Sequence, residues 1–444
     1  MRPTVARLFA GQQSAIGTPM TSHPDTSVPH HRSRIDRHDL LRISIVWAAL
    51  FMNFFLALAN ANGIGMTGNI VLGIQLIITG TAIFVIIYQP PRVGPDFVFA
   101  ITVILVGYLV SGIYHESIDP RGLYDIFVIP IFMMLGMTLH KLKSWMVNVP
   151  MSIIVLVALA DGLLRDQYAS IINPLSYYRS TRAWVADQDS AFREASGLYV
   201  GADRSGGLVF SFLSDHRVGS IFLEPLSLGY FGVIAAIAYA IVYEDQRKKF
   251  LFGASICLFL ALLADTRAAA FLVIITVSLV LLAKKVPVVF VYFIPIVVMF
   301  LGAIIYLNYS GGGGDLLFRL GLTYKEFFNS NSLSLLVGNV SSDQIYDSGI
   351  INITQSVGLI SAIVLIYLVS GGFGYKWSRF SFVPLVTVIY VMITLLFGGA
   401  VFSIKTAAML GVLIGRSGRV DDVSNQNSAL SACPQGGVKA SLAS

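Results

Sequence analysis

Long apolar runs separated by short polar connections make up most of this chain. The apolar residues follow one another continuously instead of alternating every second position, a pattern that predicts helices rather than the strands of a membrane barrel. A helix that crosses a bilayer needs about 20 apolar residues. We therefore predict an all-α, polytopic membrane bundle of about 12 transmembrane helices. The runs lie at 42–61, 69–88, 96–114, 123–140, 147–164, 225–243, 249–264, 268–283, 286–307, 349–369, 380–397 and 400–415.

The composition agrees with a chain that is surrounded by lipid. Of the 444 residues, 55% are hydrophobic and 12% are charged, whereas soluble domains are charged at about a quarter of their positions. One water-soluble core could not bury so much apolar surface. We expect a disordered cytoplasmic arm over 1–41, a membrane domain over 42–415 and a polar cytoplasmic tail over 416–444.

Basic side chains in the short connections indicate the orientation. Short loops rich in Lys and Arg stay in the cytoplasm, and each even-numbered run is followed by such a loop. Both termini are therefore expected inside, and two long connections, at about 165–224 and 308–348, are expected outside. The net charge is +6, and the basic residues lie in short loops beside the helices. This distribution reports the orientation in the membrane, so we expect no nucleic-acid partner. The residues are Arg92, His140, Lys141, Lys143, Arg247, Lys248, Lys249, Lys284, Lys285, Lys376, Arg379, Arg416 and Arg419.

The two cysteines give no sign of a crosslink or a metal site. Cys257 lies in an apolar run and Cys433 in the polar tail, so the two thiols should occupy different environments and form no disulfide. No Cys/His cluster has metal-ligand spacing. We expect neither a bound metal nor another cofactor.

The first long connection is rich in arginine and contains no lysine. Acidic residues balance its charge, so it is not a bulk attractor for anions. A preference for Arg favours planar, bidentate contacts with phosphate or carboxylate. The alternative is a folded loop held by internal Arg–carboxylate pairs, and the sequence leaves both open. The arginines are Arg165, Arg179, Arg182, Arg193, Arg204 and Arg217.

The end of this connection carries its most informative residues. His216 and Arg217 stand shortly before Glu224 and Pro225, which open the next apolar run. Proline suits the first turn of a helix and an acid suits its positive end, so helix entry alone explains Glu224 and Pro225. It does not explain Arg217, whose charge would lie at the membrane surface.

A tight turn between two apolar runs holds Asp265, Thr266 and Arg267. Two charges in such a hairpin should pair with each other or line a cavity. Asp265 and Arg267 therefore either form a local salt bridge, or Arg267 provides a second cation for an anionic ligand.

A third candidate is Asp347, just before the run at 349–369. Asp347 or Ser348 could cap that helix, or Asp347 could accept a proton from an alcohol at the outer face. Further candidates are His115, Glu116 and Arg121, in a short outer loop, and Lys405, near the outer end of the last run.

Together these features resemble the O-antigen polymerase and ligase superfamily, and within it the polymerases of bacterial exopolysaccharides. The resemblance rests on the many helices, the large mid-chain outer connection with a second one later, and three short motifs. These are Arg217 to Gly229, which runs into a helix through a proline, Thr266-Arg267-Ala268 after a short outer turn, and Asp347-Ser348-Gly349 through Gly358. It covers residues 42–415. Ligases usually place a His where this chain has Asp347, which favours the polymerase branch.

The resemblance implies a glycosyltransferase of the bacterial inner membrane that needs no metal. The donor and the acceptor would be oligosaccharides linked to polyprenyl diphosphate, with membrane lipid, a chain-length regulator and a flippase as partners. Arg217 and Arg267 would neutralise the diphosphate, and Asp347 or, second, Glu224 would be the base. His216, Asp265 and the loop arginines would complete the substrate site.

Two rival functions remain open. A ligase would use the same donor and move a finished glycan to another acceptor. A transporter or flippase for lipid-linked sugars would place charges deep within its helices, whereas here the singled-out charges stand at helix ends.

Overall fold

The computed structural model describes residues 37–116, 120–182, 185, 197–202, 208–282, 287, 289–308, 315–338, 348–371 and 382–418. Arg193, Arg204 and Asp347 lie outside the described residues, as do almost all of the expected N-terminal arm and most of the tail.

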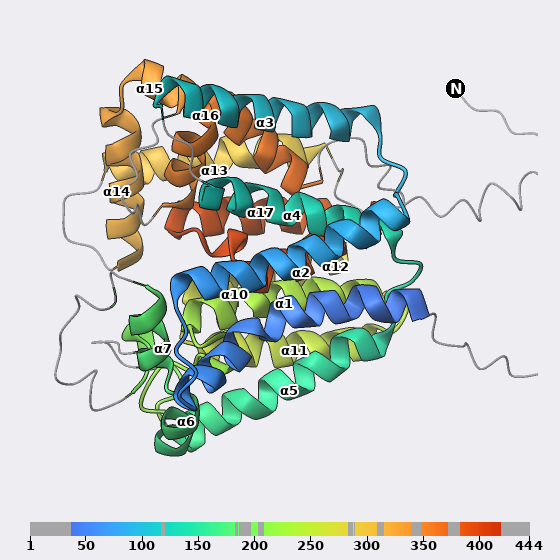
Figure 1. The fold of residues 1–444 in the computed structure, drawn as a ribbon, viewed down its shortest axis with the longest axis vertical. Helices are drawn as coiled ribbons and strands as arrows, with labels where there is room; N and C mark the ends of the chain where they lie inside the picture. The colour runs from blue at the N-terminus through green and yellow to red at the C-terminus, as the bar shows by residue number, and fades with distance from the viewer. Residues whose placement is uncertain are drawn as a thin grey trace, which may run out of the picture. The chain divides into compact units, whose positions relative to one another are not determined.

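Within these segments every regular element is a helix, and each of the twelve apolar runs coincides with one. Eight of the helices are long and apolar enough to cross a membrane (Figure 1). They are α1 (Arg37–Ala61), α2 (Gly68–Tyr88), α3 (Pro95–Tyr114), α4 (Pro120–Thr138), α5 (Ser144–Leu163), α10 (Pro225–Val242), α13 (Phe290–Leu307) and α16 (Gly349–Val369). Among the described residues, the helical class and the membrane-spanning length of these helices are thus confirmed.

Four apolar runs form shorter helices, of 14 to 17 residues. They fall below the roughly 20 residues of a standard span, so the full count of twelve crossings and the sidedness of the termini stay predictions. These helices are α11 (Arg247–Leu263), α12 (Arg267–Leu282), α17 (Phe382–Phe397) and α18 (Ile404–Ser417).

Helix ends follow local chemistry. Proline is the first residue of α3, α4 and α10, where its missing N–H costs no intrahelical bond. The helix α1 begins at Arg37, five residues before the expected start of the first run at 42, and its first turns contain a buried ion pair of 2.7 Å between Asp39 and Arg42.

The helices α4 and α18 are in close contact. A Cβ added at Gly415 would lie 1.9 Å from the carbonyl oxygen of Met133, and one at Gly411 would lie 2.7 Å from that of Ile129. Only glycine permits this approach, which is the small-residue packing typical of helices in membranes. It holds the first turns of α4 and α18 at the same end of the molecule.

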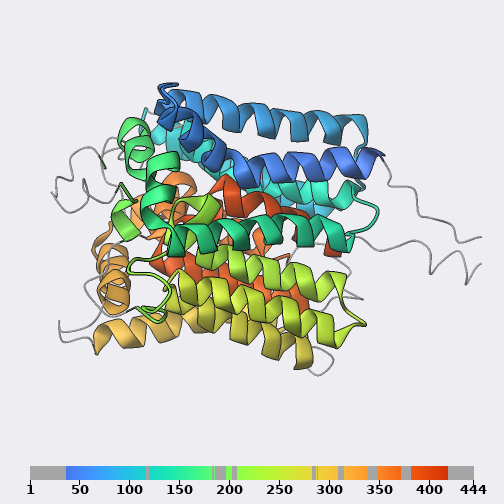
Figure 2. The same ribbon diagram turned by 90° about the horizontal axis from the view of Figure 1, so that it is seen from below.

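Both segments expected to be long loops contain short helices. Figures 1 and 2 show these helices gathered at one end of the long ones. The first segment holds α6 (Arg165–Ile172), α7 (Pro174–Thr181), η1 (Val200–Ala202) and η2 (Ser220–Phe222), and the second holds α14 (Asp315–Asn329) and α15 (Ser332–Val337). They form an ordered layer over the ends of the membrane helices.

A candidate anion-binding site

A cavity of about 780 Å³ lies beneath this layer. The first turns of α2, α4 and α10 line it, together with α7, α14 and the short turn η4 (Ala400–Phe402). Segments that are far apart in sequence thus meet at one site, at the end of the molecule to which both long connections belong.

The described lining of the cavity is predominantly cationic. Its charged side chains are four arginines and two acids, an excess of two positive charges (4 − 2). Arginine presents a rigid fork of donors that matches phosphate and carboxylate oxygens, so the lining suits an anion with several such oxygens. The residues are Arg121, Arg182, Arg217, Arg319, Asp125 and Glu224.

Arg217 is held in place by backbone carbonyls. Its Nε donates to Ala264 at 3.2 Å and its Nη1 to Gly201 at 3.1 Å. The turn before α12 is itself fixed to α10, because the hydroxyl of Thr266 donates to the carbonyl of Pro225 at 3.3 Å. Two of the motifs recognised in the sequence therefore meet, and together they orient this guanidinium group at the cavity.

Glu224, the residue before α10, is held by two cations. Its carboxylate lies 2.6 Å from Arg182 and 3.2 Å from Lys405, and it accepts a hydrogen bond from Ser227 at 2.8 Å. Burial alone would raise the pKa of Glu224, but Arg182 and Lys405 outweigh burial and hold that pKa well below its ordinary range. A carboxylate in this state is a weak proton acceptor, so its surroundings favour a role in positioning Arg182 over the expected second role as a base.

Aromatic rings complete the setting of Arg182. Its guanidinium carbon lies 4.4 Å from the ring centre of Tyr178, a cation–π contact. The rings of Tyr178 and Tyr199 are 4.8 Å apart. Burial raises the pKa of Tyr199 to about 12, so its phenol stays protonated and can donate a hydrogen bond to a ligand.

Arg319 enters the cavity from α14. This helix is fixed to α17 because the Thr323 hydroxyl donates to the carbonyl of Leu396 at 3.1 Å. Arg319, Arg217 and Tyr230 all line the same cavity.

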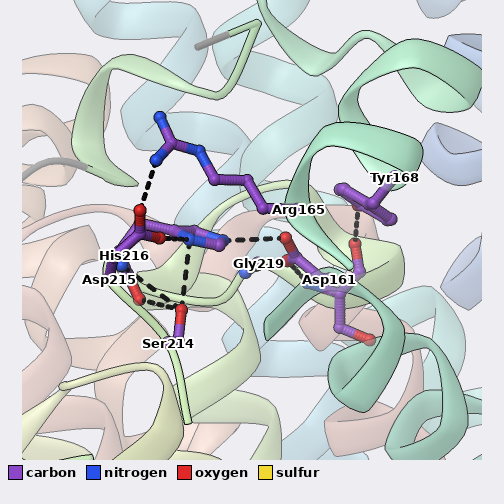
Figure 3. A network of polar contacts seen from close by, with 8 residues as sticks. Asp161, Arg165, Tyr168, Ser214, Asp215, His216 and Gly219 are labelled. Atoms are coloured by element: carbon purple, nitrogen blue, oxygen red, sulfur yellow. Dashed lines mark hydrogen bonds and ion pairs between the residues drawn. The ribbon is translucent and has the colours of Figure 1, made fainter. Parts of the chain in front are cut away.

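His216 lies in a different place from its neighbour Arg217. It is 5% exposed, and its two ring nitrogens contact Asp161 at 3.0 Å and Asp215 at 2.9 Å (Figure 3). It does not belong to the described lining of the cavity. The structure therefore does not bring His216 to the cavity with Arg217, and its expected role in substrate contact stays a prediction.

Asp161, at the end of α5, is the centre of this network. Its other carboxylate oxygen accepts the backbone N–H groups of Gly219 and Ser220 at 2.8 and 2.9 Å, and Ser220 also accepts from Tyr168 (Figure 3). An ionised carboxylate that receives several N–H donors is well stabilised even when it is buried. Asp161 thus holds the segment that carries Arg217 and Glu224.

The structure separates Arg267 from the cavity. Its side chain is 65% exposed, lies 3.8 Å from Asp265 and is not part of the described cavity lining. Asp265 is buried, with a left-handed backbone (φ 45°). The salt-bridge interpretation of this turn is the one that the geometry supports, and the two residues are not brought together with Arg217 as ligands for one anion.

Three charged residues of these two sites were missed in the sequence, namely Arg319, Asp125 and Asp161. The two acids stand inside apolar runs, where a charge is costly and signals a functional or structural partner. Arg319 gave a weaker signal, because its segment was expected to be a loop.

No family model, curated protein or solved structure matches this chain. The function therefore rests on the chemistry of the cavity.

Proposed function

We propose that this chain is a polysaccharide polymerase that joins polyprenyl-diphosphate-linked oligosaccharide units at the outer face of the bacterial inner membrane. The observation that carries the proposal is the cavity in which Arg182, Arg217 and Arg319 meet at the end of a set of apolar helices. Such a site can neutralise a diphosphate at the depth where the carrier's headgroup would lie.

The cavity meets the main demand of glycosyl transfer from a diphosphate donor. Negative charge develops on the diphosphate as its bond to the sugar breaks, and fixed cations in a partly enclosed site stabilise that charge. Arg217, held by two carbonyls, and Arg182, held by Glu224, are oriented before a ligand binds. Donors that are already in place lose little free energy in reorganisation.

The surroundings of the cavity also suit a lipid-linked substrate. The first residues of α2 line the cavity, and beyond them α2 presents large exposed apolar side chains. Ile77, Phe84 and Ile87 are each 69–72% exposed. Exposed apolar side chains on a helix of this length would contact the lipid in which a polyprenyl carrier is embedded.

The decisive experiment compares two arginine variants in cells that lack the native gene. Arg217→Ala should leave the protein inserted but prevent polymer formation, so that single lipid-linked repeat units persist. Arg165→Ala is the matched control, because Arg165 pairs with Asp215 and is not among the described residues lining the cavity. It should support normal polymer.

Two outcomes would overturn the proposal. Normal chain length with Arg217→Ala would show that the cavity has no part in polymerisation. Long glycans that remain unattached on their carrier would indicate a ligase, because a ligase defect blocks transfer of the finished chain and leaves polymerisation intact.

A further inference from the structure

Five tyrosines belong to the described lining of the cavity, and their hydroxyl groups differ in what they contact. Those of Tyr177 and Tyr178 donate to acceptors of the chain at 3.3 and 3.4 Å. The hydroxyl of Tyr124 accepts from a threonine at 3.3 Å, and that of Tyr199 is hydrogen-bonded to an arginine. The fifth, on Tyr230, makes no hydrogen bond to any residue that the structure describes.

The backbone that carries Tyr230 is held from two directions. Tyr230 lies in the second turn of α10, and residues of the first turn line the cavity with it. The hydroxyl of Ser227 donates to Glu224 at 2.8 Å, and the carbonyl of Pro225 accepts from Thr266 at 3.3 Å. The start of α10 is therefore fixed both to the segment before it and to the turn before α12.

The ring of Tyr230 is also fixed, whereas its hydroxyl is not enclosed. The side chain is 4% exposed, and its ring meets that of Tyr390 edge to face with 6.1 Å between the centres. Among the described residues, the hydroxyl of Tyr390 is fully buried without a hydrogen-bond partner. The hydroxyl of Tyr230 is not among these fully buried atoms, so it retains contact with the space of the cavity.

The surroundings of Tyr230 offer many donors and few acceptors. The four arginines of the described lining can only donate hydrogen bonds. Glu224 accepts from Arg182, Lys405 and Ser227, and neither of the two described acids of the lining is hydrogen-bonded to the phenol of Tyr230. A protonated phenol is a donor, so the acceptor that matches it has to be part of the ligand.

Building on the proposed function, we infer that Tyr230 binds the diphosphate by donating a hydrogen bond from its hydroxyl to a phosphate oxygen. The arginines supply the charge that holds the anion. Tyr230 adds a neutral donor on a ring that is already in position, so little side-chain freedom is lost when the bond forms. Bonds from a hydroxyl to an ionised oxygen are short and strong.

The test measures binding by the full-length protein in lipid nanodiscs. The probes are polyprenyl diphosphate that carries no sugar and polyprenol of the same length. Tyr230→Phe keeps the ring and removes only the hydroxyl, so it should weaken binding of the diphosphate by about tenfold or more, as expected for a hydrogen bond to a charged group. Binding of polyprenol and the apparent Tm should stay close to those of the wild type.

Tyr390→Phe is the matched control. It makes the same change in the ring that packs against Tyr230, but it removes a buried hydroxyl that has no partner among the described residues. Affinity for the diphosphate should therefore equal that of the wild type, and the apparent Tm should stay the same or rise.

Three results would overturn the inference. Unchanged diphosphate binding by Tyr230→Phe would show that the hydroxyl does not contact a phosphate, and would leave the polymerase proposal intact. An equal loss of affinity in Tyr390→Phe, or a loss of both lipids in Tyr230→Phe, would show that the hydroxyl supports the fold instead.

The proposed function can fail separately. If Tyr230→Phe loses affinity for the diphosphate as expected but cells with Arg217→Ala still make polymer of normal length, the cavity binds a diphosphate without polymerising glycans. That pair of results would support the role of Tyr230 and overturn the polymerase proposal.

Discussion

His216 and Arg217 are neighbours in the sequence, yet one lies in a buried hydrogen-bonded network and the other lines a cavity. His216 lies in the buried network around Asp161, where two carboxylates, a serine hydroxyl and backbone groups engage one another (Figure 3). Arg217 lies at a cavity of about 780 Å³ beside Arg182 and Arg319. We call the buried network around Asp161 the closed region, because its side chains bond to one another and to the backbone. We call the cavity the open region, because several arginines line a space that a ligand could enter.

The contrast shows how one region can position the residues of another. Like charges that line one cavity disfavour each other, so their segments have to be held in place by the surrounding structure. Asp161 provides part of that support, because it binds the backbone between Arg217 and Glu224. The predictions that follow separate the two regions, since one should affect stability and the other transfer.

Removing the central carboxylate should have the largest effect. Asp161→Ala leaves His216 and two backbone N–H groups without their acceptor in a buried site, a loss of about 3–5 kcal/mol. The apparent Tm in detergent should fall strongly. Asp166→Ala, an exposed acid on the adjacent α6, is the control and should melt as wild type. Equal melting of the two variants would show that the network does not hold the fold.

Removing a cavity arginine should act on transfer instead. Arg319→Ala should lower the rate of glycan transfer by about 100-fold or more, the cost of losing one fixed donor to a developing charge, while the apparent Tm changes little. Lys325→Ala, an exposed cation on the same helix, is the control. If the Tm falls as far as it does in Asp161→Ala, Arg319 belongs with the structural region.

The closed region should also give stability a pH dependence. Burial lowers the pKa of His216, but Asp161 and Asp215 outweigh burial and raise that pKa above its ordinary value of about 6.5. The stabilisation from the charged ring is therefore complete below about pH 6.5 and is lost as the pH rises through the folded-state pKa. The Tm difference between wild type and His216→Gln should shrink from about pH 5 to about pH 9. A constant difference would contradict this.

The exposed ion pair at the edge of the closed region should have the smallest effect on stability and on transfer. Arg165 pairs with Asp215 at 2.5 Å, but the Asp215 side chain is 64% exposed. Exposed ion pairs contribute at most about 1 kcal/mol, so Arg165→Ala should change the apparent Tm only slightly and transfer not at all. A fall in Tm as large as that of Asp161→Ala would mean that the exposed Arg165–Asp215 pair, rather than Asp161, stabilises the network.

The sequence predicted the helices well because the signal for a membrane helix is local. Each apolar run became a helix, and Pro95, Pro120 and Pro225 begin helices as proline chemistry favours. Which runs are long enough to cross the bilayer was harder to predict. The length of α11 depends on the turn at Asp265, whose left-handed backbone follows the end of that helix.

The site could be predicted only in part, because side-chain direction depends on tertiary contacts. Arg217, Arg182 and Glu224 were expected at the site and do line the cavity. Arg267 was expected there too, but the turn at Asp265 directs Thr266 inward to Pro225 and leaves Arg267 exposed. Nothing local to positions 216 and 217 shows that one side chain is buried against α5 while the next reaches the cavity.

The central claim, that the open region is a diphosphate site, is tested most directly by binding. Wild-type protein in nanodiscs should bind polyprenyl diphosphate more tightly than polyprenol of the same length. The double variant Arg217→Ala/Arg319→Ala should lose about tenfold or more in affinity for the diphosphate, as expected for charge-assisted bonds to phosphate, and keep its affinity for polyprenol. Equal affinity of the wild type for the two lipids, or unchanged diphosphate binding by the double variant, would contradict the account.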